Sequence, residues 1–199
     1  MKEILFATSN TSKIKRFEAG LNKNNVNILT PKDLNINIDV DENGKDAVEN
    51  AKIKARAYYN LTHITTIAMD DNLYIEGIPL DKQPGMFVRR VNGKRLSDNE
   101  MIEHYTNLVK MYGENGKLTA KWVYAMALIK DGVEHTYTWS KEDFYLVKEP
   151  SLVINIGYPL NSISVNKKLN KYFTDMTQED KESISQTEDD VISFILSNV

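Results

Sequence analysis

The sequence predicts an α/β fold in which helices flank an elongated, mixed β-sheet, with residues 1–199 forming one domain. Early in the chain, short apolar runs alternate with segments whose apolar residues recur at helical spacing, as in βαβ units. Later, two long runs of aromatic and β-branched residues flank Asp131-Gly132, which favours an antiparallel hairpin. At 199 residues and 41% hydrophobic content, the chain is large enough to bury one core.

The first half of the chain is predicted to form three strands and two helices. Asp46 is of a residue type that caps helix N-termini, and the stretch from Pro31 through Gly44 is acidic, rich in asparagine and expected to be a loop. The expected strands are Ile4–Ala7, Val26–Leu29 and Ile64–Ala68, and the expected helices are Lys13–Leu21 and 47–61.

The second half begins with a helix signal, because Ser97 and Glu100 have the spacing of a capping box. The hairpin strands are expected at Leu118–Ile129 and Glu134–Val147. Thr177 is expected to cap one last helix, whose core-facing residues are Ile184, Val191, Ile192, Ile195 and Leu196.

The composition excludes several classes of function. The net charge of -3 lacks the basic excess of a protein that binds nucleic acid polymers. The absence of cysteine excludes disulfides, thiolate zinc sites and cysteine nucleophiles, and it agrees with a reducing compartment. No apolar run is long enough for a signal peptide core or a membrane span. We therefore expect a cytoplasmic protein without a membrane partner.

The turn from Thr8 to Lys13 is the first candidate site. A strand ends there in hydroxyl and amide side chains, and a lysine follows in the first turn of the next helix. Backbone amides, the helix dipole and an ammonium group would together favour a bound phosphate. The alternative is that Thr8, Asn10 or Ser12 only caps the helix and Lys13 is solvated.

Acidic residues form the second candidate. Asp70-Asp71 follows the apolar segment Ile64–Ala68, and carboxylates at a strand end suit a magnesium ion. Adjacent strand residues point to opposite faces, so the strand must end or bend there if both serve one site. Glu42 on the preceding loop is a further possible ligand, and Lys54 on the second helix is a possible phosphate ligand. For all of these, turn or solvated-surface roles remain open.

Taken in order, these segments resemble the inosine triphosphate pyrophosphatase family. The matching features are a Thr-x-Asn-x-x-Lys turn, a loop glutamate, a Glu-Asn-Ala-x-x-Lys-Ala helix, an Asp-Asp pair, a Pro-Gly turn and a Lys-x-x-x-Ser pattern. They correspond to Thr8, Asn10 and Lys13, to Glu42, to Glu49–Ala55, to Asp70-Asp71, to Pro84-Gly85, and to Lys181 with Ser185. The resemblance spans nearly the whole chain.

The resemblance implies a magnesium-dependent enzyme that converts a nucleoside triphosphate to a monophosphate and pyrophosphate. It implies two lobes with an active-site cleft between them, and a homodimer. The implied triphosphate ligands are Thr8, Asn10, Lys13, Lys54 and Lys181. The implied metal ligands are Glu42, Asp70 and Asp71, and the implied catalytic residues are Asp71, Asp70 and Lys13.

The segments implied to read the base depart from the family pattern. The family's Phe-Gly-Tyr-Asp-Pro is Ile156–Leu160 here, and its Ser-His-Arg is Ser185-Gln186-Thr187. We therefore expect the base preference to be shifted or relaxed, with Arg89, Tyr158 and Gln186 as candidate base contacts and Trp139 as a further possibility. The alternative function is a nucleotide-binding or sensor protein of the same fold that lacks hydrolysis.

Overall fold

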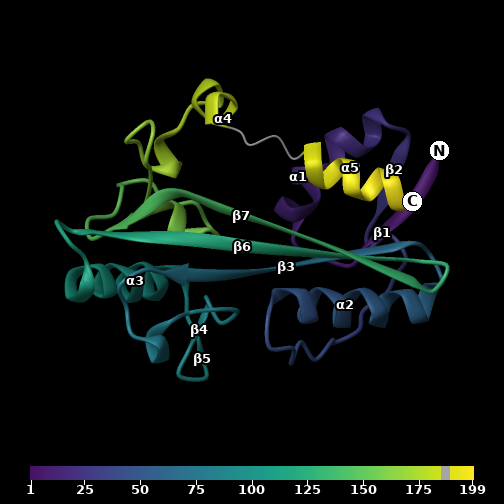
Figure 1. The fold of residues 1–199 in the computed structure, drawn as a ribbon, viewed down its shortest axis with the longest axis horizontal. Coiled ribbons are helices and arrows are strands. Elements are labelled where there is room, and N and C mark those ends of the chain that lie inside the picture. The colour runs from purple at the N-terminus through teal and green to yellow at the C-terminus, as the bar shows by residue number, and fades with distance from the viewer. Residues whose placement is uncertain (185–188) are drawn as a thin grey trace. The chain divides into compact units, whose positions relative to one another are not determined.

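The computed structural model describes residues 1–184 and 189–199. The strands are β1 (Lys2–Phe6), β2 (Val26–Leu29), β3 (Thr66–Ile75), β4 (Arg90–Val91), β5 (Lys94–Arg95), β6 (Lys117–Lys130), β7 (Val133–Val147) and β8 (Ser164–Asn166). The helices are α1 (Thr11–Lys23), α2 (Ala47–Thr62), α3 (Asp98–Tyr112), α4 (Gln178–Ile184) and α5 (Asp189–Asn198). One sheet has the order β2-β1-β3-β6-β7-β8, and β4 and β5 form a second (Figure 1).

The chain divides into two compact units. The first comprises Met1–Asp71, Tyr124–Trp139 and Gln186–Val199, and the second comprises Asn72–Val123 and Ser140–Ser185. The strands β3, β6 and β7 each contribute residues to both units. Because β1 pairs in parallel with β2 and β3 while β7 and β8 are antiparallel, the predicted mixed α/β fold is confirmed.

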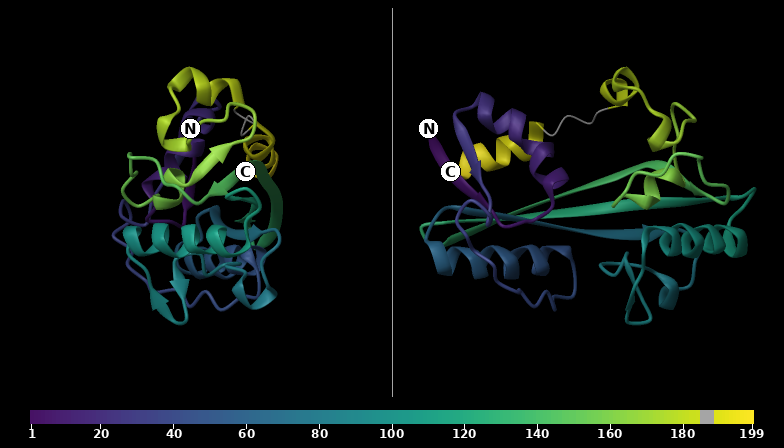
Figure 2. Two further views of the ribbon diagram at one scale, coloured as in Figure 1. Left: turned by 90° about the vertical axis from the view of Figure 1, so that its left-hand side faces the viewer. Right: turned by 180° about the vertical axis from the view of Figure 1, so that it is seen from behind.

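Two different cores cover the two faces of the sheet in the first unit. On one face, large side chains such as Phe17 of α1, Met69 of β3 and Ile195 of α5 pack together. On the other face, alanines of α2 pack against alanines of the strands, including Ala68. Figures 1 and 2 show α1 with α5 on one side of the strands and α2 on the other. Small residues let the backbone of α2 approach the sheet closely.

The second unit has its own core around Tyr105 of α3 and Phe144 of β7. The predicted capping box of α3 is present: Glu100 N–H donates to Ser97 Oγ at 3.3 Å, and Ser97 N–H donates to Glu100 Oε2 at 2.8 Å. This unit also contains short 3-10 helices at Leu80–Lys82, Pro159–Ser162 and Phe173–Asp175.

The hairpin prediction is confirmed at the turn between β6 and β7. Asp131 has φ 49° and Gly132 has φ 76°, so both central residues adopt the left-handed conformation that a type I′ turn requires. Gly132 N–H also donates to the hydroxyl of Tyr59 on α2 at 2.9 Å. The turn is thereby fixed to the helix that covers this face.

One predicted boundary was wrong. The third strand does not end before the aspartate pair, because β3 continues through Asp70 and Asp71 to Ile75. The predicted last helix includes residues 185–188, which lie outside the described residues; on either side of them the structure has α4 and α5. Thr177 Oγ1 accepts from Asp180 N–H at 3.1 Å, so it caps α4, whereas the buried apolar residues belong to α5.

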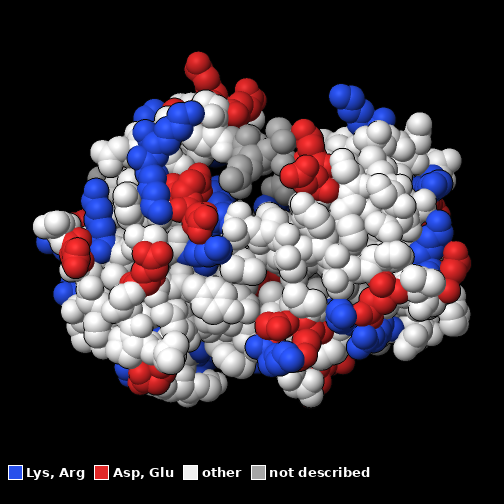
Figure 3. All heavy atoms as spheres, in the orientation of Figure 1, with Lys and Arg blue, Asp and Glu red and all other residues white. Residues whose placement is uncertain are grey.

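The surface agrees with the small net charge. On the face drawn in Figure 3, lysine and arginine side chains are interspersed with acidic ones. None of the helices in the described part of the chain has the length and apolar composition that a membrane span requires.

Candidate functional site

The turn between β1 and α1 is held by its own side chains. Asn10 is the N-cap of α1, and its Oδ1 accepts from the backbone N–H groups of Ser12 at 2.9 Å and Lys13 at 3.4 Å. Thr8 Oγ1 accepts from Asn10 N–H at 3.1 Å. Of the three possible caps, Asn10 is the one used. The turn that would receive a phosphate is therefore already ordered at the positive end of the helix dipole.

Lys13 is not solvated as the alternative reading supposed. Its Nζ lies 2.6 Å from Asp71 Oδ1 and 3.4 Å from the carbonyl oxygen of Met69. The two side chains of the ion pair are only 22% and 25% exposed. The first turn of α1 is thus joined to the middle of β3 by a partly buried charge pair.

A second ion pair lies on the α2 side of the strands. Lys54 Nζ lies 2.7 Å from Glu42 Oε2, with side-chain exposures of 16% and 35%. The loop that carries Glu42 is anchored to α2 because Gly44 N–H donates to Asn50 Oδ1 at 2.9 Å. A Cβ atom on Gly44 would come within 2.9 Å of Asn50 N and 2.6 Å of Glu49 Cβ, so only glycine fits.

The charges of both lysines, Lys13 and Lys54, act on the carboxyl of Asp70. Burial raises the pKa of its carboxyl above the ordinary value, while Lys54 and Lys13 act to lower the pKa and Asn50 hydrogen-bonds to the carboxyl. Since Ala68 packs on the α2 side and Met69 on the α1 side, strand alternation directs Asp70 toward α2 and Asp71 toward α1. The two aspartates therefore point to opposite faces of the sheet, and a lysine lies on each of these faces.

A pocket of about 590 Å³ opens beside this arrangement. It lies at the carboxyl ends of β1 and β2, where ligands commonly bind in sheets with parallel strands. Three of the predicted site residues, Thr8, Glu42 and Lys54, line it together with Tyr58 and with the loop segments 30–32 and 36–40. The volume is in the range typical of small-molecule sites.

The carboxylates offer the chemistry of a hard cation site, since Glu42, Asp70 and Asp71 all supply oxygen ligands. Within residues 1–184 and 189–199, however, no three acidic or histidine side chains gather closely enough to hold an ion. Glu42 and Asp71 each face a lysine instead. The donor set therefore fits magnesium in kind, and each lysine would have to leave its carboxylate for a cation to be coordinated there.

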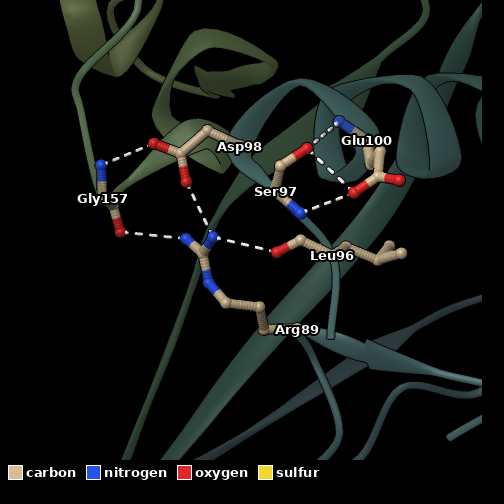
Figure 4. A network of polar contacts seen from close by, with 6 residues as sticks. All are labelled: Arg89, Leu96, Ser97, Asp98, Glu100 and Gly157. Carbon is tan, nitrogen blue, oxygen red and sulfur yellow. Dashed lines mark hydrogen bonds and ion pairs between the residues drawn. The ribbon is translucent and has the colours of Figure 1, made fainter. Parts of the chain in front are cut away.

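In the second unit, Arg89 fixes a loop (Figure 4). Its Nη1 donates to Asp98 Oδ1 at 2.7 Å and to the carbonyl oxygen of Leu96 at 3.3 Å, and its Nη2 donates to the carbonyl oxygen of Gly157 at 3.2 Å. Asp98 Oδ2 accepts from Gly157 N–H at 2.7 Å. The hydrogen bond from Gly157, followed by that from Arg89, lowers the pKa of Asp98. The predicted base contact Arg89 thus has a clear role in holding Gly157.

Of the remaining predicted residues, Tyr158 and Lys181 lie in the second unit. Tyr158 follows the Arg89-bound glycine and is 40% exposed. Lys181 is exposed on α4. Gln186 and Ser185 lie outside the described residues. The base contacts and Lys181 stay predictions.

Sequence reasoning missed Asn50 and Tyr58. Asn50 is 3% exposed and bridges the Glu42 loop to Asp70. The signal for it was present, because it stands beside Ala51 on the apolar face of an amphipathic helix, where a polar residue needs a partner. Tyr58 lines the pocket, and burial followed by the charge of Glu42 raises the pKa of its hydroxyl.

The chain is similar to known proteins over its whole length. A family model described as the Ham1 family matches residues 4–191. The dITP/XTP pyrophosphatase of Leptospira interrogans serovar copenhageni is 28% identical over 198 residues, covering 98% of this chain and 97% of the relative. That of Bacillus subtilis is 28% identical, covering 95% and 93%.

Two solved structures share the fold. The Staphylococcus aureus Ham1 protein superposes with a TM-score of 0.75 at 24% identity, covering 100% of both chains. A HAM1 protein from Coxiella burnetii gives a TM-score of 0.78 at 23% identity, covering 99% of this chain and 100% of the other.

Proposed function

The chain belongs to the Ham1 family, and on that premise we propose that it hydrolyses a nucleoside triphosphate to a nucleoside monophosphate and pyrophosphate. Curated relatives that match almost the entire chain are named dITP/XTP pyrophosphatases, which are hydrolases of a phosphoanhydride. The observation that carries the proposal is the pair of lysine–carboxylate contacts, Lys13–Asp71 and Lys54–Glu42, on either side of Asp70. Such a cleansing enzyme would remove unwanted triphosphates from the nucleotide pool.

The triphosphate is proposed to bind at the first turn of α1. Thr8, Asn10 and Lys13 present hydroxyl, cap and ammonium groups there, and Lys54 supplies a second ammonium beside the pocket. When phosphate oxygens arrive, Lys13 and Lys54 can exchange a carboxylate for a phosphate oxygen at little electrostatic cost, because one anion replaces another. Lys181 is proposed as a further cation by resemblance alone.

The carboxylates released by this exchange, Glu42 and Asp71, are proposed to hold magnesium together with Asp70, which requires β3 to bend at the aspartate pair because Asp70 and Asp71 point to opposite faces. The ion would supply charge neutralisation for the phosphates when bound. The chain's own residues orient the substrate and accept the proton of the attacking water on a carboxylate of the Asp70–Asp71 pair. Water attacks the α-phosphorus, the bond from that phosphorus to the bridging oxygen breaks, and pyrophosphate leaves.

The base preference is proposed to be shifted or relaxed. Tyr158 and Gln186 are proposed base contacts, while the donors of Arg89 already bind Asp98 and Gly157. Neutral side chains at Gln186 and Thr187 remove charged donors, and discrimination that rests on such donors is large when they are buried. The proposed cleft between two lobes, the homodimer and the cytoplasmic location follow from the resemblance and the composition.

The test is a panel of canonical, deaminated and pyrimidine nucleoside triphosphates assayed for pyrophosphate release with magnesium. The proposal expects turnover of at least one, and Asp71→Asn is expected to abolish it. Absence of pyrophosphate release from every nucleotide would refute the proposal. Triphosphate binding by calorimetry without any turnover would favour the sensor alternative instead.

A further inference from the structure

A cluster of aromatic rings surrounds Arg16 in the first unit. The guanidinium carbon of Arg16 lies 4.6 Å from the ring centre of Tyr124, 5.4 Å from that of Trp139 and 5.6 Å from that of Phe17. The rings of Tyr124 and Trp139 are stacked, with centroids 5.2 Å apart and planes 23° apart. Phe17 is buried, but Arg16, Tyr124 and Trp139 are all partly exposed. A guanidinium therefore lies over two stacked rings that belong to partly exposed residues.

The cluster contains an energetically unfavourable feature that packing of the core does not explain. The indole N–H of Trp139 is buried and has no hydrogen-bond partner among the described residues. Burying such a donor without a hydrogen-bond partner is unfavourable. Departures of this kind from good packing are expected mainly at functional sites.

The cluster lies beside the proposed triphosphate site. Arg16 follows Lys13 by three residues on α1, which places the two side chains on neighbouring positions of one helix surface. Asp71 on β3 continues the sheet face formed by Ile67 and Met69. Tyr124 packs on that same face from the adjacent strand β6. The ion pair of Lys13 with Asp71 and the aromatic cluster thus share α1 and one face of the sheet.

We propose that the base of the substrate stacks on the cluster formed by Arg16, Tyr124 and Trp139. This inference rests on the proposed function and adds a stacking surface for the base to the base contacts proposed above for Tyr158 and Gln186. Guanidinium planes and aromatic rings both stack on nucleobases, and such stacking tolerates every base because each has a π-face. A site of this kind binds ligands that carry a base more tightly than ligands that lack one. It would thereby account for the relaxed base preference proposed above.

The first test uses tryptophan fluorescence. The chain has two tryptophans, Trp122 and Trp139, and Trp122→Phe leaves Trp139 as the single reporter. Inosine triphosphate is expected to quench this emission, and inorganic tripolyphosphate, which has no base, is expected to leave it unchanged. Equal responses to both ligands would overturn the proposal.

The second test compares two neighbouring cations on α1. Arg16→Ala is expected to weaken inosine triphosphate binding about tenfold while leaving tripolyphosphate binding unchanged, since one stacked base contributes about 1–3 kcal/mol. The control Lys15→Ala removes an equal charge from an exposed position of the same helix and is expected to change neither affinity. Arg16→Lys keeps the charge without the planar face and is expected to match Arg16→Ala, and circular dichroism checks that each variant is folded.

The outcomes separate this inference from the proposed function. If the wild-type protein hydrolyses nucleoside triphosphates and Arg16→Ala and Arg16→Lys bind them normally, only the stacking site is refuted. An equal loss of affinity for tripolyphosphate would also refute it, because Arg16 would then act on the phosphates. If the wild-type protein binds neither ligand, the proposed function fails as well.

Discussion

Asp70 and Asp71 are adjacent in sequence, yet the same substitution is predicted to shift stability in opposite directions. Asp71 forms a 2.6 Å ion pair with Lys13, and the two side chains are 25% and 22% exposed. Asp70 is held in surroundings that disfavour its charge, because burial raises its pKa. Asp71→Asn therefore removes a favourable charge, whereas Asp70→Asn removes an unfavourable one.

The loss of stability expected for Asp71→Asn follows from the ion pair with Lys13. A hydrogen bond to a charged group contributes about 1.5–3 kcal/mol, and partial exposure places this one near the lower limit, about 1.5 kcal/mol. For a chain of this length, that corresponds to a fall in Tm of about 3–6 °C. Differential scanning calorimetry at pH 7.5 and low salt measures it.

The gain of stability expected for Asp70→Asn depends on pH. Well below the ordinary aspartate pKa of 3.8, the carboxyl is neutral in both folded and unfolded chains, so the variant and the wild type should have similar stability. As the pH rises through the raised folded-state pKa, the wild type loses this contribution, whereas the Asp70→Asn variant has no carboxyl to ionise. We therefore expect a higher Tm for Asp70→Asn at pH 7.5 and convergence well below pH 3.8. A lower Tm at pH 7.5, or a gain that persists in acid, would refute the electrostatic assignment.

Four further outcomes are expected. Gly44→Ala should lower Tm and reduce turnover, because its Cβ would lie 2.8 Å from Asn50 Oδ1 and displace the Glu42 loop; Asn43→Ala, at an exposed position of that loop, is the control for Tm. Asn50→Ala should cost about 1–3 kcal/mol by chemical denaturation, since it leaves the Gly44 N–H without its acceptor. Arg89→Ala should increase amide hydrogen exchange at Gly157, and unchanged exchange there would show that Arg89 does not hold the loop. Because the folded-state pKa of Asp98 is lowered, its stabilising contribution is present above pH 3.8 and is lost as the pH falls through the folded value, so Asp98→Asn should flatten the acid limb of the stability profile.

Local chemistry made several features predictable from sequence. Asp46 and Ser97 cap α2 and α3 as expected, because a cap needs only a side-chain acceptor two or three residues before the N–H groups it satisfies. The Asp131-Gly132 turn was equally predictable, since both residue types tolerate positive φ.

The interactions that build the site depend on distant segments and were not predictable. The sequence left Lys13 open between a phosphate ligand and a solvated helix surface, and only the placement of β3 brings Asp71 to it in a partly buried ion pair. The aspartate pair itself caused the end of the third strand to be predicted too early. Charged residues are unfavourable in strands by propensity, yet β3 passes through both aspartates. Asp71 forms an ion pair with Lys13, and the charges of Lys54 and Lys13 partly offset the burial that raises the pKa of Asp70.

The central claim is that water attacks the α-phosphorus of a nucleoside triphosphate. Hydrolysis in ¹⁸O-labelled water, followed by mass spectrometry of the products, tests it most directly. The account predicts one labelled oxygen in the nucleoside monophosphate and none in the pyrophosphate. Label in pyrophosphate, or release of inorganic phosphate with a nucleoside diphosphate, would contradict it.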